Sequence, residues 1–454
     1  MPARVVIVGA GVGGLAAAHH LTVQAAARGL PLDVVVLEAA DTPGGWLGTE
    51  RFEGALLERG PDTVVTHKPA GLALCARLGL AGRLVYKPAG RIDVLDGGRL
   101  LSLPAGFALA VPTRPRSLLA SSLLSWRGKL RALAEPWRAA RPLDADESVA
   151  SYVRRRFGDE LYRRMSEPVV GGLFMADTEE LSLGASFPRL AGGGRLTRPS
   201  GGATAPPPPP VATLDGGLGQ IVEALVARLP AGTLQLGRRV EGISRTGEGF
   251  LLKTPGGPPF AADAVLLALP APASAALVAD LDPGLSAVLG RIPYASAVTA
   301  HLAWPHRAVG RPPRCHGFFV PRTAGSAVVA ASFVSVKYPE RVPADQLVVR
   351  VFLGGALHPE AIGQSDADLV DLAARLLAPL LDVREPPAWS RVWRHPGAMP
   401  QRRVGHPALV EHLRARLAEH PGLAFAGGPL GAYGVPDSIA EGEAAAERVL
   451  QRVG

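Results

Sequence analysis

An apolar run at the start of the chain leads directly into a glycine-rich turn, and one carboxylate ends the next apolar run. The turn consists of Gly9, Ala10, Gly11, Val12, Gly13 and Gly14, and the carboxylate is Glu38. In a strand-turn-helix unit the first glycine permits a tight turn, the second lets the backbone approach a pyrophosphate, and the third lets the helix pack on the strand. The helix then directs its amino terminus at the pyrophosphate, and the carboxylate accepts hydrogen bonds from ribose hydroxyls. This order predicts a dinucleotide site, with a glycine turn in an ordinary α/β protein as the alternative.

A second pair of glycines, Gly44 and Gly45, follows Glu38 closely and is itself followed by Trp46. A nicotinamide dehydrogenase does not need this pair, whereas it resembles the motif of the flavin amine oxidase and protoporphyrinogen oxidase superfamily, apart from Thr42 in place of a usual arginine. Residues 263–270 resemble the strand that returns to the FAD domain of that superfamily, and residues 423–439 resemble its last flavin segment. The resemblance implies FAD as the cofactor.

The same resemblance implies an α/β fold with a Rossmann-like FAD-binding domain built from discontinuous segments. A second domain, of α+β type with a mixed sheet, would bind substrate, and a helical insertion would interrupt it. We expect the FAD-binding domain at 1–80, 211–270 and 404–454, the substrate domain at 81–104 and 271–403, the insertion at 105–191, and a linker rich in glycine and proline at 192–210. A chain of 454 residues is long enough for two or three such cores.

Composition narrows the classes of partner. The formal charge of +8 suits anionic ligands or an anionic membrane surface, but no basic run with interleaved aromatics predicts nucleic-acid binding. Two cysteines give neither a disulfide framework nor a cysteine metal site, the histidines have no ligand spacing, and we expect no metal. A cytoplasmic location follows. The uncharged stretch 264–279 is too short to span a bilayer, which needs about 20 residues.

One helical stretch leaves peripheral membrane contact open. From residue 112 the chain is rich in tryptophan and arginine, including Trp126 and Trp137. Such a pattern is typical either of a helix at a membrane interface or of an amphipathic packing face. We therefore keep a peripheral position at the inner face of the cell membrane as an alternative, and a homodimer is also compatible with the sequence.

Four further stretches are similar to protoporphyrinogen oxidases of the oxygen-dependent type and their bacterial coproporphyrinogen-oxidising relatives. The first resembles a second FAD contact and contains Gly60, Pro61, Asp62 and Thr63. Residues 98–104 resemble a substrate-domain hairpin, residues 167–188 resemble the stretch that lines the porphyrinogen pocket, and residues 400–406 match a late motif. The resemblance covers most of the chain and implies oxidation of protoporphyrinogen IX in haem synthesis, with coproporphyrinogen III as the alternative.

The chain also departs from the family pattern. The departures are at Met175, Ala176, Arg402, Leu430, Ala432 and Tyr433, where Arg402 replaces a usual tyrosine and Tyr433 a usual valine. These changes touch the expected pocket more than the cofactor cradle. FAD binding is therefore predicted more firmly than the substrate.

Family chemistry assigns roles to a few residues. A flavin oxidase removes hydride from a carbon beside a nitrogen and passes the electrons to O2, and much of this chemistry belongs to the cofactor. Substrate carboxylates need a cation, for which Arg91 is the candidate, with a solvated surface arginine as the alternative. Gly172 and Phe174 would form the floor of the pocket, or simply pack a helix turn. We name no catalytic side chain.

The remaining cofactor contacts also come from the resemblance. Val240 resembles the residue whose backbone meets the adenine, and Trp46 would either cover the flavin or be a buried structural residue. Tyr433, Gly434 and Val435 belong to the last flavin segment. Two other functions stay open: a flavin amine oxidase or carotenoid-type desaturase, and a flavin-binding carrier without catalysis.

Overall fold

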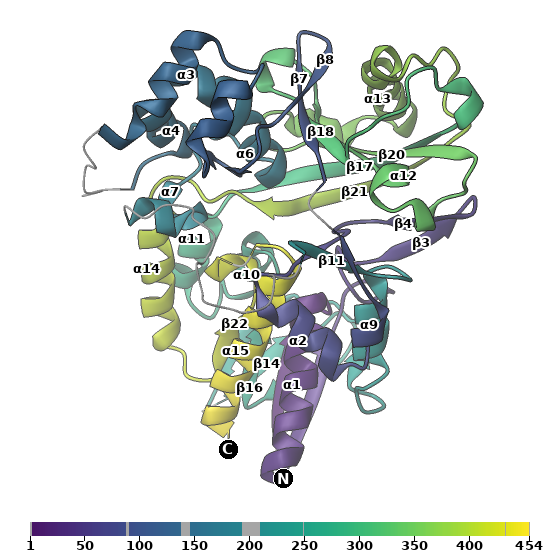
Figure 1. Ribbon diagram of the computed structural model, residues 1–454. Coiled ribbons are helices and arrows are strands. Elements are labelled where there is room, and N and C mark those ends of the chain that lie inside the picture. Colours follow the sequence, from purple (N-terminus) through teal and green to yellow (C-terminus); the bar gives the residue numbers. More distant parts are fainter. Residues whose placement is uncertain are drawn as a thin grey trace.

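The computed structural model describes residues 2–87, 90–137, 146–192, 209–247, 249–431 and 433–453. Two sheets are stacked along the long direction of the molecule, with a group of helices beside the upper sheet (Figure 1). Both ends of the chain lie together at the lower end. The predicted linker lies almost wholly outside the described residues.

The lower sheet has five parallel strands in the order β12-β2-β1-β16-β22. Its strands are β12 (Leu234–Gln235), β2 (Leu32–Leu37), β1 (Ala3–Val8), β16 (Ala264–Leu267) and β22 (Leu423–Phe425). They read as nearly continuous apolar runs because both faces of the sheet are covered, one by helices and the other by the strands of residues 242–262 with two further helices. The apolar run that Glu38 ends and the segments 263–270 and 423–439 thus each contribute a strand to one sheet.

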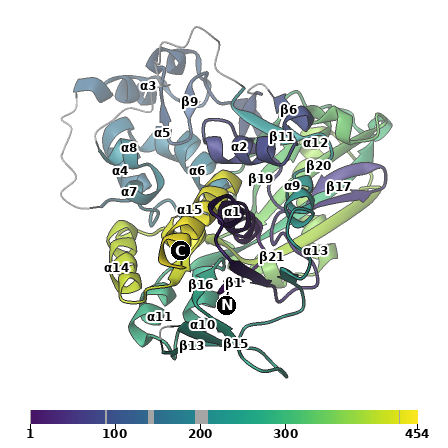
Figure 2. The same ribbon diagram turned by 90° about the horizontal axis from the view of Figure 1, so that it is seen from below.

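Two long helices pack side by side on this sheet, α1 (Val12–Arg28) and α15 (Val435–Val453) (Figure 2). They approach closely because a Cβ on Gly442 would lie only 2.1 Å from the carbonyl oxygen of Gly13. Helices α9 (Gly219–Val226) and α2 (Pro69–Arg77) contribute to the same core. The first and last parts of the chain are therefore held together by direct helix packing.

The upper sheet has seven strands in the order β21-β17-β20-β19-β18-β7-β8. They are β21 (Trp389–Pro400), β17 (Tyr294–Pro305), β20 (Gln346–Gly354), β19 (Val328–Phe333), β18 (Gly317–Phe319), β7 (Ile92–Asp96) and β8 (Arg99–Ser102). Only the β18–β7 pair is parallel, so the sheet is mixed as expected. The predicted hairpin is present as β7 and β8, whereas β21 and helix α13 (Asp366–Leu381) were not predicted.

The two faces of β17 serve different neighbours. Val298, Leu302 and Trp304 join the core beneath α13, whereas Thr299 on the opposite face donates a hydrogen bond to the carbonyl of Arg59 in the lower half. This alternation follows from the two-residue period of a strand. The second face of the upper sheet thus forms one wall of the junction between the two halves.

The helical group beside the upper sheet has its own core. It contains η2 (Pro115–Ala120), α3 (Trp126–Leu133), η3 (Glu135–Trp137), α4 (Val149–Phe157), α5 (Asp159–Leu161), the π-helical turn η4 (Tyr162–Ser166), α6 (Glu167–Phe174), α7 (Leu183–Ser186) and α8 (Pro188–Ala191). A two-residue hairpin of β9 (Phe107–Ala108) and β10 (Val111–Pro112) precedes them. None of the described helices has the length and apolar character needed to cross a membrane.

Three helices of the predicted substrate and terminal segments pack together below the junction. They are α10 (Ala271–Leu277), α11 (Pro283–Gly290) and α14 (His406–Ala418). Residues of α10 and α11 share a core with Val6, Val8 and Leu267 of the lower sheet. We predicted that the substrate domain resumes at residue 271, whereas the upper sheet itself resumes only at Tyr294.

Smaller elements complete the lower half and the junction. The small sheets are the hairpin β3 (Thr49–Phe52) and β4 (Ala55–Glu58), the sheet of β5 (Val64–Val65), β11 (Val211–Leu214) and β6 (Leu84–Lys87), and the meander β13 (Gly242–Thr246), β14 (Gly249–Lys253) and β15 (Phe260–Ala262). The short helical turns are η1 (Ala81–Arg83), η5 (His306–Ala308), η6 (Arg322–Ala324), α12 (Val334–Lys337), η7 (Pro339–Arg341), η8 (Pro359–Gly363) and η9 (Gly428–Leu430).

Candidate functional site

The two predicted glycine turns are in direct contact. The Gly44 N–H donates a 2.8 Å hydrogen bond to the carbonyl oxygen of Ala10, and Gly11 and Gly44 form an isolated parallel bridge. A Cβ on Gly45 would lie 3.5 Å from the Cα of Gly11. The turns therefore form one continuous backbone surface above the carboxyl ends of β1 and β2.

Glu38 lies at the end of β2 and faces this surface. Its Oε2 accepts a 2.7 Å hydrogen bond from the Ala10 N–H, and its Oε1 accepts a 2.9 Å bond from the Ala40 N–H. A carboxylate offers about four acceptor positions, so each oxygen keeps capacity for a ribose hydroxyl. The two backbone bonds fix the direction in which that capacity points.

The glycines of the first turn have different surroundings. A Cβ on Gly14 would lie 2.0 Å from the Gly9 carbonyl oxygen, so Gly14 is required by packing between α1 and β1. A Cβ on Gly11 would meet nothing within 4 Å, and no side chain caps the helix there. The first N–H groups of α1 consequently lie beside open space, as an anion site at a helix amino terminus requires.

The last predicted cofactor segment closes against the first turn. A Cβ on Gly13 would lie 2.9 Å from the Ser438 carbonyl oxygen in α15. Gly434, just before Val435 begins that helix, has a φ of +86° and open space at its Cβ position. The structure thus brings residues 9–14, 44–45 and 434–438 into one cradle.

The third predicted contact, Gly60 to Thr63, is held by buried and partly buried charged side chains. A Cβ on Gly60 would lie 2.0 Å from the Trp46 carbonyl oxygen, and the Arg350 guanidinium donates to the carbonyl of Gly60. Lys337 Nζ lies 2.8 Å from Asp62 Oδ2. Burial alone would raise the pKa of Asp62, but Lys337 and Arg350 outweigh it and hold that pKa well below its usual range. Neighbouring Thr63 donates from its hydroxyl to Asp62 Oδ1 at 3.3 Å.

A second buried pair braces the same turn. Arg341 Nη1 lies 3.0 Å from Glu58 Oε1, and Arg341 Nη2 donates to Thr213 Oγ1 and to the carbonyl of Leu214. Both charged side chains are at most 3% exposed. Burial raises the pKa of Glu58 in spite of the opposing charge of Arg341. The pair joins the upper and lower halves next to Gly60–Thr63.

Trp46 borders the junction between the halves. Its ring meets His395 of β21 edge to face at 5.4 Å, and His395 Nε2 lies 3.2 Å from Thr299 Oγ1. Burial, helped by the charge of Arg350, lowers the pKa of His395 to about 4. The ring is therefore neutral at physiological pH and adds no charge to this wall.

Phe174 and Tyr433 meet at the end of α6. Their rings are 4.5 Å apart, and the Tyr433 hydroxyl donates a 2.7 Å hydrogen bond to the Leu173 carbonyl. Arg402 also lies over the Tyr433 ring, with its guanidinium carbon 5.3 Å from the ring centre. Phe174, Tyr433 and Arg402, which all belong to the expected pocket, are thus neighbours in space, although Tyr433 and Arg402 depart from the family pattern.

Gly172 has a steric reason to be glycine. A Cβ there would lie 2.5 Å from the Phe319 ring and 3.1 Å from the Val329 carbonyl oxygen. This contact packs α6 against β18 and β19, which favours the packing interpretation for Gly172. Its role in binding substrate stays a prediction.

Arg91 is exposed at the surface, whereas Val240 is buried. Arg91 forms a forked ion pair with the fully buried Asp93, with distances of 2.9 Å from Nε and 2.7 Å from Nη2. Its charge is therefore already balanced, and its role as the substrate cation stays a prediction. Val240 is buried in the core beneath the lower sheet.

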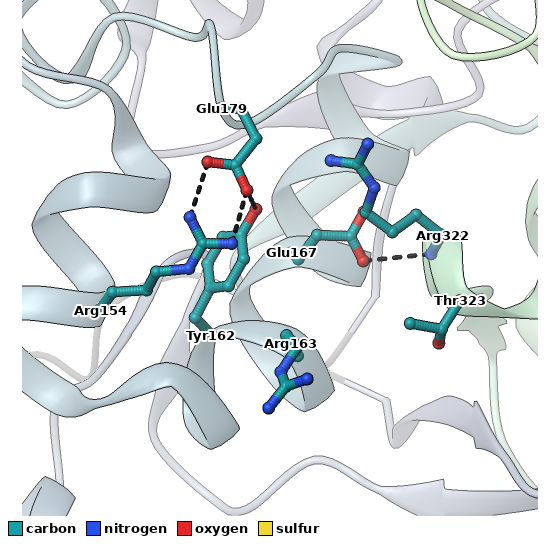
Figure 3. A pocket seen from close by; sticks show the side chains of 7 residues that line it. All are labelled: Arg154, Tyr162, Arg163, Glu167, Glu179, Arg322 and Thr323. Atoms are coloured by element: carbon teal, nitrogen blue, oxygen red, sulfur yellow. Dashed lines mark hydrogen bonds and ion pairs between the residues drawn. The ribbon is translucent and has the colours of Figure 1, made fainter.

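A polar pocket of about 280 Å³ lies at the opposite end of α6 from Phe174 (Figure 3). Its lining residues are Arg154, Tyr162, Arg163, Glu167, Glu179, Arg322 and Thr323. Glu167 Oε2 accepts a hydrogen bond from the backbone N–H of Arg322 at 3.2 Å, and burial raises the pKa of Glu167 to about 7. Arg154 is already paired with Glu179 through both η-nitrogens. The charges of this pocket are largely matched within the protein.

Comparison with known proteins identifies the family. The model of the flavin-containing amine oxidoreductases matches residues 12–450. This chain belongs to that family. The flavoprotein is 30% identical to coproporphyrinogen III oxidase of Bacillus subtilis over 98% of both chains. It is 32% identical to the enzyme of that name from Propionibacterium freudenreichii, over 98% of this chain and 90% of the relative.

Further relatives extend the similarity. Protoporphyrinogen oxidase of Macaca fascicularis is 29% identical over 99% of both chains. The crystal structure of a protein described as a protoporphyrinogen oxidase from Exiguobacterium sp. 255-15 superposes with a TM-score of 0.86, at 28% identity over 99% of both chains. Cyclohexylamine oxidase from Brevibacterium oxydans, at 19% identity and a TM-score of 0.69, shares the fold. The predicted family and fold class are confirmed.

The cofactor of this flavoprotein is FAD, and the residues present fit it. The open positions at Gly11 and Gly434 leave room for backbone to approach a dinucleotide, and Glu38 is oriented towards them. The flavin supplies two-electron oxidation when bound. The chain is an FAD-dependent oxidoreductase.

Sequence reasoning missed the buried cations of the site. Arg350 interrupts the apolar run 347–353. Burying an arginine without a hydrogen-bond partner is costly, so its presence in this run could have indicated a site residue. Arg402 was noticed only as a departure. Lys337 and Arg341 carried no local signal, because their partners lie more than 270 residues away.

Proposed function

We propose that this flavoprotein oxidises a porphyrinogen to the corresponding porphyrin in haem synthesis, with O2 as the electron acceptor. The observation that carries the proposal is similarity over nearly the whole chain to enzymes named for porphyrinogen oxidation. We propose coproporphyrinogen III as the substrate, because the bacterial relatives bear that name. Protoporphyrinogen IX, which the sequence analysis placed first, is the second candidate and is supported by the primate relative.

The residues of the chain have the tasks of binding, orienting and excluding water. The turn at Gly60 and the segment from Tyr433 to Val435 would border the flavin, and Phe174 would border the macrocycle. A neutral His395 beside the Trp46 ring adds no charge to this region. No acid–base side chain is needed if hydride passes directly to the cofactor.

Anaerobic mixing tests the substrate. The purified holoenzyme is mixed without oxygen with coproporphyrinogen III or protoporphyrinogen IX, and the loss of flavin absorbance is followed. We expect rapid bleaching with coproporphyrinogen III, and reoxidation with production of H2O2 when O2 is admitted. Bleaching by a primary amine or a carotenoid precursor, and by neither porphyrinogen, would contradict the proposal. A flavin that no reductant bleaches would favour a carrier.

We also propose that the helical group touches an anionic membrane surface. Trp126, Leu130 and Trp137 are 68%, 64% and 83% exposed, and the Lys129 ammonium lies 4.8 Å from the Trp126 ring centre. Exposed aromatic rings beside cations are typical of interfacial binding. We expect the protein to float with vesicles that contain anionic lipid, and the double variant Trp126→Ser, Leu130→Ser to remain behind. Equal flotation of both proteins would contradict this proposal.

A further inference from the structure

Arg402 follows β21 at a point where three segments of the chain meet. Its Nη1 donates a 3.1 Å hydrogen bond to the Ala185 carbonyl in α7, and its Nη2 donates a 2.5 Å bond to the Gly431 carbonyl before α15. The residue is only 7% exposed. Each η-nitrogen thus has one carbonyl partner, while the buried Nε has no partner among the described residues.

The charge of Arg402 is not balanced by a carboxylate. No described acidic side chain lies within ion-pair distance of its guanidinium, in contrast to the buried Arg341, which has Glu58. The acid that influences Arg402 electrostatically is Asp437, and Asp437 is already paired with Lys68 at 2.6 Å. His406 does not add a second positive charge, because burial and the charge of Arg402 lower its pKa to about 4.

Such an arrangement is unfavourable unless an anion completes it. Carbonyl oxygens satisfy N–H groups but leave a full positive charge in a medium of low polarity, which is costly. A guanidinium presents its Nε and one η-nitrogen along a single edge, which fits the two oxygens of a carboxylate. Arg91 uses this edge for Asp93, whereas in Arg402 the Nε of that edge is without a partner.

The neighbours of Arg402 belong to the candidate site. Its guanidinium stacks over Tyr433, whose other neighbour is Phe174, the residue expected at the floor of the substrate pocket. We propose that Arg402 binds a carboxylate of the substrate, with Tyr433 fixing the plane of the guanidinium. This inference rests on the proposed function, because coproporphyrinogen III is an amphiphilic macrocycle that carries propionates.

A binding experiment with an acid and its ester isolates this charge. Holoenzyme is titrated with coproporphyrin III, the oxidised tetracarboxylate, and with its tetramethyl ester, and quenching of protein fluorescence gives the dissociation constants. We expect Arg402→Gln to weaken binding of the acid 10-fold to 100-fold and to leave binding of the ester within twofold. The midpoint potential of the flavin should not change.

Arg403→Gln is the matched control. Arg403 is the adjacent arginine, is more than half exposed and pairs with Glu180 at 2.9 Å, so its replacement removes the same charge outside the candidate site. We expect it to bind both ligands as the wild type does. If Arg402→Gln does not fold, Arg402→Met, whose unbranched chain fills much of the same volume, is judged by the same two ligands.

The outcomes separate the two proposals. If Arg402→Gln loses affinity equally for the acid and the ester, or loses none for either, the proposed role of Arg402 is overturned. A changed flavin potential with unchanged binding of porphyrin would also overturn it and assign the charge to the cofactor. Failure of the wild type to bind either ligand would instead count against the proposed function.

Discussion

The two ends of the candidate site differ in the groups that form them, which are mainly backbone at one end and side chains at the other. At the nucleotide end the surface consists of backbone groups from two glycine turns and one carboxylate, Glu38. At the end where we propose that the flavin ring and the substrate bind, the site consists of side chains from distant segments, among them Arg350, Arg402 and Tyr433. A ligand that is common to many enzymes can be held by backbone geometry, whereas a particular substrate needs particular side chains. We therefore expect mutations at the two ends to have different kinds of effect.

Removal of the buried cation at Arg341 is the most severe change. Arg341→Met leaves the Glu58 carboxylate buried without its partner, and we expect the free energy of unfolding in urea to fall by about 3–5 kcal/mol. The control Arg375→Met breaks an exposed pair with Asp371 and should cost less than about 1 kcal/mol. Similar losses in the two variants would mean that the buried pair does not hold the substrate end together.

The carboxyl of Glu167 gives a smaller effect that depends on pH. In the folded protein it keeps its proton up to about pH 7, whereas the unfolded chain loses that proton near 4.5. The folded state thus binds more protons in this window, and wild-type stability should fall by about 3 kcal/mol relative to Glu167→Gln as pH rises from 4.5 to 7. Urea unfolding of both proteins at several pH values measures the difference. Parallel curves would show that Glu167 is ionised in the fold.

At the nucleotide end we expect loss of affinity without loss of stability. A methyl group on Gly11 meets nothing in the protein, and its φ of −65° suits alanine, so the apoprotein Gly11→Ala should unfold like the wild type. The methyl group would meet the dinucleotide, and the dissociation constant for FAD should rise about 10-fold, or about 1.4 kcal/mol. Gly14→Ala, whose Cβ would clash with the Gly9 carbonyl, should instead destabilise the apoprotein. Equal FAD affinity of Gly11→Ala and wild type would mean that Gly11 does not lie against the dinucleotide.

The difference between the two ends also explains how far the sequence could be interpreted. The glycine turns, β1, β2, β16 and β22 carry local patterns, and the predicted FAD fold follows from them. The strands β17 to β20 also consist largely of apolar residues, which is a local pattern typical of buried strands. Local patterns could not predict the contact of Arg350 with Gly60 or that of Arg402 with Tyr433, because each joins residues that are separate in the sequence. Arg91 illustrates a second limit. Its partner Asp93 is only two residues away, but the sequence does not show that Asp93 is buried in the fold and so needs a cation beside it.

The order of strands in the lower sheet affects how the protein can be made. The sheet needs β22, and the cradle needs Gly434 and the start of α15, which are translated long after the first glycine turn. A nascent chain therefore has only part of the nucleotide pocket until these segments have emerged from the ribosome. We expect the vitamin-derived cofactor to be captured only after that point, and truncation before residue 423 to leave a product that aggregates rather than a smaller holoprotein.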